Sequence, residues 1–312
     1  MILDALFPGE CHEVSFETFM AHALHHPATG YYARSISTVG SKGDFTTAAE
    51  ISPALATAIA HWLRSELART GCRHIIELGP GSGQLAQTVW QRLPLLTRWR
   101  TTMHLVESSA PLRKIQQARK ALRHVQWHAT IAEAMSACGG HACLYSNEFF
   151  DAFPVRIFQR QAERWQELYL QRDVDRSGVK EILRDVDPLP DSTLWARPFA
   201  ENQRVEVFAS VQKWLMEWFP QWRQGAMLTI DYGDEVQRLY HRRPRGSIRG
   251  YLAQQRIEGP GIYQNIGRQD LTCDINFSDL IAWTAAHVDS APLQSQAAFL
   301  QSHAQIDRKS VV

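Results

Sequence analysis

Short apolar stretches alternate with amphipathic stretches through the middle of the chain. Helical spacing of the apolar residues predicts helices at about 84–92, from Ser109 and Pro111 onwards, and near 131–137. The short apolar runs, which we expect to be strands, lie at 74–78, 103–106, 125–127 and 142–145. A β-α-β-α series of this kind is the signature of a parallel sheet with helices on both faces, in which ligands bind beyond the carboxyl ends of the strands.

A longer helix is predicted ahead of the first strand. Ser52 suits its N-cap, Pro53 its first helical position, and Gly71 the position after its C-cap. The apolar residues that recur between them at helical spacing are Leu55, Ile59, Leu63 and Leu67. One face of this helix should therefore be buried.

The pattern changes after about residue 155. Residues 155–190 alternate as strands do and are joined by polar turns, which predicts an inserted antiparallel meander. Residues 205–222 are expected to be helical, and a fifth parallel strand is expected at 226–233. The segment 234–269 is rich in Arg, Gly and Pro and favours an irregular lobe. The tryptophans expected on one helix face, as core or a partner interface, are Trp214, Trp218 and Trp222.

Composition narrows the classes of function. The 312 residues include 45% hydrophobic and 21% charged residues, which is an ordinary globular composition. A net charge of +1 gives no overall attraction to nucleic acid or an anionic membrane. A local binding patch of one charge is compatible with that net charge. The five cysteines form no C-x-x-C pair and no zinc-ligand set, so we expect reduced packing thiols and no metal. No apolar run reaches the roughly 20 residues of a membrane helix. The first 33 residues contain no Lys or Arg, which argues against a secretory or mitochondrial leader. We therefore expect a cytoplasmic protein without a membrane span or a nucleic-acid partner.

A glycine-rich turn follows the first strand of the series. Gly79, Gly81 and Gly83 permit positive φ and close approach of a ligand to the backbone. A dinucleotide fingerprint would need glycine at position 84, where the chain has Gln84, so NAD is disfavoured. The remaining alternative to a cofactor loop is a tight turn with a helix-capping acid.

Two acids at strand ends accompany that turn. Glu77 is placed to neutralise the cationic amino-acid end of S-adenosylmethionine, and Glu107, after the second strand, to accept hydrogen bonds from both ribose hydroxyls. Polar residues also follow the fourth strand, where Asn147, Glu148 and Asp151 stand among three phenylalanines. Such a setting suits a site that excludes water.

Six motifs together resemble a known family. They are HPATGYYA (26–33), GDFTTAAEISP (43–53), ELGPGSGQLA (77–86), NEFFDAFPV (147–155), IDYG (230–233) and DLTCDINF (270–277). In this order they resemble the MidA-like S-adenosylmethionine-dependent methyltransferases, a family that includes the mitochondrial protein arginine methyltransferase assisting assembly of respiratory complex I. Two features depart from the family pattern. Ala49 stands where proline is usual, and no hydrophobic strands follow residue 300.

The resemblance implies a class I, Rossmann-like α/β methyltransferase fold with an N-terminal helical cover and an inserted β meander. The C-terminal strands of that fold are expected to be missing from this chain. It implies S-adenosylmethionine as cofactor, Gly79, Gly81 and Gly83 as its loop, and Glu107 at the ribose. Asn147, in the loop past the fourth strand, is expected to be a further cofactor-binding residue. The expected parts are a cover at 1–70, a cofactor-binding core at 71–154, a meander or substrate lobe at 155–200, a return to the core at 201–233, an irregular acceptor lobe at 234–300, and a truncated or artefactual tail at 301–312.

The resemblance also implies symmetric dimethylation of an arginine in a protein acceptor, such as a respiratory-chain subunit. A guanidinium is always charged, so a carboxylate that binds it through two hydrogen bonds would orient it. We therefore predict Glu148, with Asp151 second, as the guanidinium-holding acids; the alternative is that Glu148 binds the cofactor. A small-molecule acceptor and an assembly chaperone with a retained pocket are the competing functions.

Other residues are weaker candidates for the acceptor site. His25 and His26 are candidates for a base or for the pocket lining, against a structural role. Residues 44–47, Asp44, Phe45, Thr46 and Thr47, are expected to cover the cofactor, with a turn preceding a helix as the alternative. Three acids are candidates for the rim of the acceptor site, with cap or loop roles as the alternative, and they are Asp231, Asp270 and Asp274.

Overall fold

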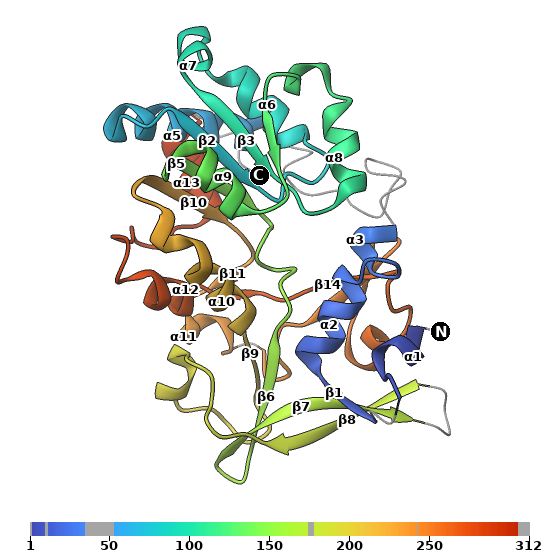
Figure 1. Ribbon diagram of the computed structural model, residues 1–312. Helices are drawn as coiled ribbons and strands as arrows, with labels where there is room; N and C mark the ends of the chain where they lie inside the picture. Colours follow the sequence, from blue (N-terminus) through green and yellow to red (C-terminus); the bar gives the residue numbers. More distant parts are fainter. Residues whose placement is uncertain (1, 10–11, 35–52, 174–177, 242, 305–312) are drawn as a thin grey trace. The chain divides into compact units, whose positions relative to one another are not determined.

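The computed structural model (Figure 1) describes residues 2–9, 12–34, 53–173, 178–241 and 243–304. The chain divides into two compact units. Unit 1 comprises residues 1–37, 150–215 and 232–290, and unit 2 comprises residues 38–149, 216–231 and 291–312. The expected N-cap Ser52, the expected cover residues 44–47 and the end of the tail, 305–312, lie outside the described residues.

A parallel sheet organises unit 2. Its strands lie in the order β10 (Gln224–Ile230), β5 (His141–Asn147), β2 (His74–Leu78), β3 (Thr102–Val106) and β4 (Gln126–His128). The chain runs outward from β2 to β3 and β4, then returns to the other side of β2 with β5 and β10. The strand order therefore reverses at β2, and ligands bind in such sheets outside the carboxyl ends at this reversal.

Helices cover both faces of this sheet, as predicted. One face packs against α5 (Pro53–Thr70), α6 (Gln84–Arg92) and α13 (Gln296–His303), and this core includes Ile75, Leu105 and Tyr145. α9 (Ile131–Cys138) contacts β2 to β5 with its buried side chains. The other helices of unit 2 are α7 (Leu95–Arg100), α8 (Ala110–Gln117) and the 3₁₀ turns η1 (Lys120–Leu122) and η3 (Phe219–Gln221). Ser109 caps α8 as expected, accepting a hydrogen bond from the Leu112 amide at 3.4 Å.

Unit 1 contains the predicted antiparallel meander. Its sheet has the order β1 (Glu13–Ser15), β7 (Arg164–Asp173), β6 (Arg156–Gln161) and β9 (Arg204–Val207), with β8 (Gly178–Asp185) also paired to β7. A smaller antiparallel sheet has the order β13 (Gln255–Ile257), β12 (Arg249–Leu252) and β14 (Asp270–Thr272), and β11 (Gly233–Asp234) pairs with β15 (Ile275–Asn276).

The helices of unit 1 are mostly short. They are α1 (Ile2–Leu6), α2 (Phe16–His25), α3 (Tyr31–Arg34), α11 (Val236–Leu239), α12 (Phe277–Thr284) and the 3₁₀ turns η2 (Thr193–Ala196) and η4 (Gly259–Tyr263). α10 (Ala209–Trp218) begins in unit 1 and ends in unit 2. No helix within the described ranges is long and apolar enough to cross a bilayer.

The expectation of one helix over 205–222 is wrong at both ends. Residues 205–207 belong to β9, whose β-branched Val205 and Val207 are buried and pair with β6. The α-helix ends at Trp218 because Pro220 lacks an amide hydrogen and its ring blocks continuation. Trp222 therefore lies beyond the helix and does not share a helix face with Trp214 and Trp218.

The expected irregular lobe is also more ordered than its composition suggested. β12 and β13 form a hairpin through Ala253 and Gln254, both at positive φ (48° and 65°), and the β6–β7 hairpin turns in the same way at Ala162 and Glu163. A two-residue turn with two positive φ values normally carries Asn or Gly, and neither hairpin has that signal.

Candidate functional site

The three predicted loop glycines follow β2 at the reversal of strand order, and each has a positive φ. Their surroundings differ. A Cβ on Gly79 would lie 2.5 Å from the Phe149 ring, and one on Gly83 would lie 3.0 Å from the Gln116 side chain. A Cβ on Gly81 would meet no atom of the described residues within 4 Å. A side chain at Gly79 would overlap the Phe149 ring and one at Gly83 would need Gln116 to shift, whereas Gly81 leaves its backbone open to a ligand among the described residues.

Glu107 is buried beside this loop at the end of β3. Its Oε1 accepts a hydrogen bond from the Ser109 amide at 2.8 Å, and its Oε2 faces the Gln116 amide nitrogen at 3.4 Å. Gln116 also donates to the Gly81 carbonyl at 2.9 Å and accepts from the Trp127 indole at 3.1 Å. Burial raises the pKa of Glu107 to about 7, although the donated hydrogen bonds lower it. Gln116 thus joins the predicted ribose acid to the predicted cofactor loop.

Glu77 is buried on the α5–α6 side of the sheet. Its Oε2 accepts a hydrogen bond of 2.5 Å from the Tyr145 hydroxyl. Burial raises the pKa of Glu77 to about 8 against the lowering effect of that bond. A cation bound nearby would favour the ionised carboxylate and lower this pKa.

The segment after β5 is fixed by the neighbouring strand β10. The Glu148 amide donates to the Ile230 carbonyl at 2.9 Å, and the Phe149 amide donates to Oδ2 of Asp231 at 3.1 Å. Glu148 adopts a φ of 50°, which is unusual for a residue other than glycine. Oδ1 of Asn147 is buried and has no hydrogen-bond partner among the described residues. Asp231 therefore anchors this loop, and Asn147 presents an acceptor at the carboxyl edge of the sheet.

Asp151 belongs to unit 1, so the two predicted guanidinium-holding acids are divided between the units. Its carbonyl accepts from the Cys273 amide at 3.1 Å, and its side chain is buried. In the same unit the Tyr32 hydroxyl donates to Asp270 at 3.1 Å, and Asp151 and Asp270 both raise the pKa of Tyr32 beyond the effect of burial. Unit 1 therefore brings Asp151 and Asp270 into one electrostatic environment around Tyr32.

Two of the weaker candidates have structural partners. Asp274 forms ion pairs of 2.6 Å with both Arg249 and Arg243. His26 accepts hydrogen bonds at Nδ1 from the amides of Ala28 and Thr29 at 3.3 and 3.2 Å, which organises the turn after α2. Both residues therefore hold the fold of unit 1.

His25 lies closer to the acidic environment. Its Nε2 is 3.1 Å from the Ala152 carbonyl and its ring stacks on Tyr32 at 5.5 Å. Burial lowers its pKa, so it is neutral at neutral pH.

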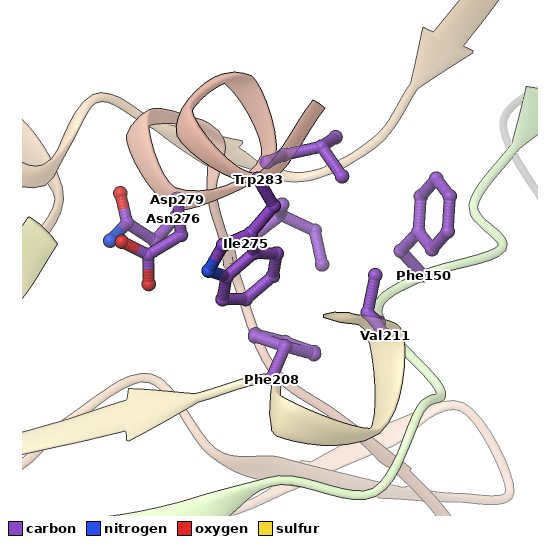
Figure 2. Close-up of a pocket in the computed structure, with 8 residues that line it drawn as sticks. Phe150, Phe208, Val211, Ile275, Asn276, Asp279 and Trp283 are labelled. Atoms are coloured by element: carbon purple, nitrogen blue, oxygen red, sulfur yellow. The ribbon is translucent and has the colours of Figure 1, made fainter. Parts of the chain in front are cut away.

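An apolar pocket lies within unit 1. Figure 2 shows the Phe150, Phe208 and Trp283 rings lining it, with the polar ends of Asn276 and Asp279 directed to one side. Asp279 binds the Ser192 hydroxyl at 2.7 Å and the Thr193 amide at 2.6 Å. The cavity measures about 10 Å³, which is room for about one water molecule. It is a packing gap and not a cofactor site.

Comparison with known proteins decides the family. A family model described as "Putative S-adenosyl-L-methionine-dependent methyltransferase" matches residues 58–294. The chain belongs to this family. It is a MidA-like methyltransferase whose cofactor is S-adenosylmethionine, as the motifs predicted.

Solved structures and curated relatives agree with this assignment. A crystal structure from Burkholderia thailandensis bound to S-adenosyl-homocysteine has a TM-score of 0.86 at 26% identity, covering 98% of this chain and 82% of the other. The relatives include the mitochondrial protein arginine methyltransferase NDUFAF7 of Danio rerio, 26% identical over 86% of this chain and 67% of its own length, and its Drosophila melanogaster homologue, 28% identical over 91% and 70%. The chain thus spans about two thirds of the length of these relatives.

The residues present fit S-adenosylmethionine. The backbone at Gly81 is open, Glu107 lies next to it through Gln116, and Asn147 has an unpartnered acceptor among the described residues. Sequence reasoning missed Gln116 and Tyr145, because their roles depend on contacts between distant parts of the chain. Tyr32 and Asp270 each lie inside a family motif, at 26–33 and 270–277, but the hydrogen bond between them could not be predicted from the sequence.

Proposed function

We propose that the chain transfers the methyl group of S-adenosylmethionine to a guanidinium nitrogen of a protein arginine. The observation that carries the proposal is the similarity to relatives that are protein arginine methyltransferases, matched over 85–93% of this chain. The acceptor is proposed to be a respiratory-chain subunit and the product symmetric dimethylarginine, on the resemblance to the MidA-like family. The proposed location is the cytoplasm, in keeping with the free, buried thiols of Cys72, Cys138, Cys143 and Cys273.

The cofactor, when bound, supplies a methyl carbon on a sulfonium, which is already a good leaving group. The chain therefore has to bind, align and desolvate the reactants. Gly81 offers its backbone, Glu107 accepts from the ribose hydroxyls, and Asn147 accepts a further hydrogen bond. Glu77 faces the cationic amino-acid end. Each of these roles is proposed from the geometry within unit 2.

Glu148 is proposed to hold the acceptor guanidinium, with Asp151 as the second acid. A carboxylate that accepts two hydrogen bonds from a guanidinium fixes its plane and can take the proton that the methylated nitrogen loses. A left-handed non-glycine residue costs about 1–3 kcal/mol and persists only where its surroundings hold it. At Glu148 the bond to Ile230 and the adjacent Asp231 anchor provide that hold.

The test is transfer of labelled methyl groups by the whole chain into proteins of a host lysate, followed by mass spectrometry of the labelled residues. The proposal requires methyl on arginine nitrogen. Label on lysine or on a small molecule would instead identify another acceptor class, and cofactor binding without transfer would support the chaperone alternative.

A matched pair of glutamates tests the role of Glu148. Glu148→Gln should lower turnover about a hundredfold or more while the affinity for S-adenosylmethionine stays within about twofold of the unmodified chain. The control is Glu163→Gln, an exposed glutamate that also has a positive φ (66°) but lies in the β6–β7 turn. Equal turnover of the two variants would remove Glu148 from the acceptor site.

A further inference from the structure

α7 exposes apolar side chains to an unusual degree. Leu95 is 76% exposed, Leu96 58% and Trp99 82%, and none of the helix's side chains is buried. They make up three of the seven large hydrophobic residues that stand exposed on the described part of the chain. Figure 1 shows α7 projecting at the top of unit 2, away from the sheet. A concentration of exposed apolar surface at one place marks a site of interaction.

Four arginines lie on α7 or close to it along the backbone. Arg92 precedes it and is exposed, Arg98 and Arg100 lie on α7 itself, and exposed Arg73 lies at its base, where the Thr102 amide donates to the Arg73 carbonyl at 2.9 Å. No Asp or Glu occurs between Glu77 and Glu107. The segment thus carries local positive charge that the net charge of +1 for the whole chain conceals.

We propose that α7 with Arg73, Arg92, Arg98 and Arg100 is a docking surface for an anionic lipid bilayer. Tryptophan favours the membrane interface, and leucine enters the acyl boundary to a shallow depth. Arginine guanidinium groups bind lipid phosphates through two hydrogen bonds. Apolar and cationic residues in a sequence segment without acids are complementary to anionic lipid headgroups.

The size of the patch favours a bilayer over a protein partner. A large aromatic side chain offers roughly 200 Å², so the three apolar residues together offer only a few hundred. A standard protein interface buries about 800 Å² on each partner. A small apolar surface with arginines on the same helix and beside it is sufficient for reversible attachment to a membrane surface.

The experiment measures sedimentation of the whole chain with vesicles. The proposal requires binding to vesicles of phosphatidylcholine with a third phosphatidylglycerol, weaker binding at high salt, and little binding to phosphatidylcholine alone. Trp99→Ala and Leu95→Ala should each lower binding about tenfold or more, and Arg92→Gln and Arg100→Gln about fivefold each. The controls are Leu293→Ala, an exposed leucine elsewhere (37% exposed), and Arg64→Gln, an exposed arginine on α5.

Two results would overturn the proposal. One is failure of the unmodified chain to bind anionic vesicles, which needs no variant and does not depend on folding of a mutant. The other is loss of a dimer in Trp99→Ala during analytical ultracentrifugation without any vesicle binding, which would make the patch an interface between copies. Affinity for S-adenosylmethionine, unchanged in the variants, reports that they are folded.

Discussion

Tyr145 donates its hydroxyl hydrogen to Oε2 of Glu77 over 2.5 Å inside unit 2. The two residues face each other across the paired strands β2 and β5, directly before the glycine loop. Burial raises the pKa of Glu77 to about 8, and the hydrogen bond from Tyr145 opposes that rise. The bond therefore favours the ionised carboxylate that we propose faces the cationic end of the cofactor.

Tyr145→Phe should destabilise the protein and weaken cofactor binding. Loss of the donor leaves a buried carboxyl without its partner, at a cost of about 1–3 kcal/mol in the free energy of unfolding. It also raises the pKa of Glu77 further. Denaturation in urea and calorimetry with S-adenosylmethionine measure the two effects. In a Glu77→Gln background the same change should cost clearly less, and an equal cost in both backgrounds would show that the pair is not coupled.

Cofactor affinity should increase as the pH rises from about 6 to about 8. The pKa of Glu107 is raised to about 7 and that of Glu77 to about 8 in the ligand-free protein, so each carries a proton over part of this range. Binding of ribose hydroxyls and a cationic amine favours the ionised acids and releases protons. Calorimetry in two buffers of different ionisation enthalpy counts those protons. Glu107→Gln should flatten the pH dependence; a pH-independent affinity in the unmodified chain would contradict the assignment.

Gly81→Ala and Gly79→Ala should fail in different ways. A Cβ at Gly81 meets no atom of the described residues within 4 Å, so the variant should fold with a loss of about 1 kcal/mol for its positive φ. It should nevertheless bind S-adenosylmethionine at least about tenfold more weakly, because we propose that the cofactor approaches there. A Cβ at Gly79 overlaps the Phe149 ring and should destabilise the fold itself. Thermal melting with and without cofactor separates the two outcomes. Unchanged cofactor affinity in Gly81→Ala would place the ligand elsewhere.

A row of three histidines crosses the other face of the sheet and predicts an acid-sensitive fold. Nδ1 of His74 is 3.0 Å from Nε2 of His104, and Nδ1 of His104 is 3.0 Å from Nε2 of His128. Burial, together with both neighbours, lowers the pKa of His104 to about 4. Among the described residues, the titratable side chains that act on the ends of the row are His141 at His74 and Glu133 at His128.

The sign of the pH effect follows from the lowered pKa. In the unfolded chain His104 takes up a proton at the ordinary histidine pKa of 6.5, whereas the buried side chain in the folded protein stays neutral down to about pH 4. The contribution of His104 to the free energy of unfolding is therefore complete above pH 6.5 and is lost as the pH falls to about 4. The loss should reach about 3 kcal/mol. His104→Gln should reduce this dependence in urea titrations from about pH 7 to pH 4, whereas exposed His124→Gln should leave it intact. An equal slope for both variants would show that the row is not responsible.

The parallel sheet of unit 2 and the class of its cofactor could be predicted from local sequence signals. Strands buried on both faces read as continuous apolar runs, and the position of Gln84 where a dinucleotide loop needs glycine distinguished the cofactor class. Pro53, Ser109 and Gly71 mark element ends through local backbone chemistry, so the described helices at these positions begin and end close to the predicted residues.

Other features depend on contacts that no local pattern contains. The hairpin turns at Ala162 and Ala253 have left-handed residues without Gly or Asn, so no turn signal was present. The sequence pattern assigns Val205 and Val207 to a helix, and only their pairing with β6 shows that they belong to a strand. Gln116 connects Glu107, Gly81 and Trp127 only after β3, β4 and the loop have come together. Domain boundaries and individual site roles stay predictions.

A crystal structure of the chain with S-adenosyl-homocysteine tests the central claim most directly. The account predicts the nucleotide along the backbone of residues 79–83, both ribose hydroxyls on the Glu107 carboxylate, and a polar group of the ligand on Oδ1 of Asn147. Ligand density elsewhere, or a ribose held by a residue other than Glu107, would contradict it.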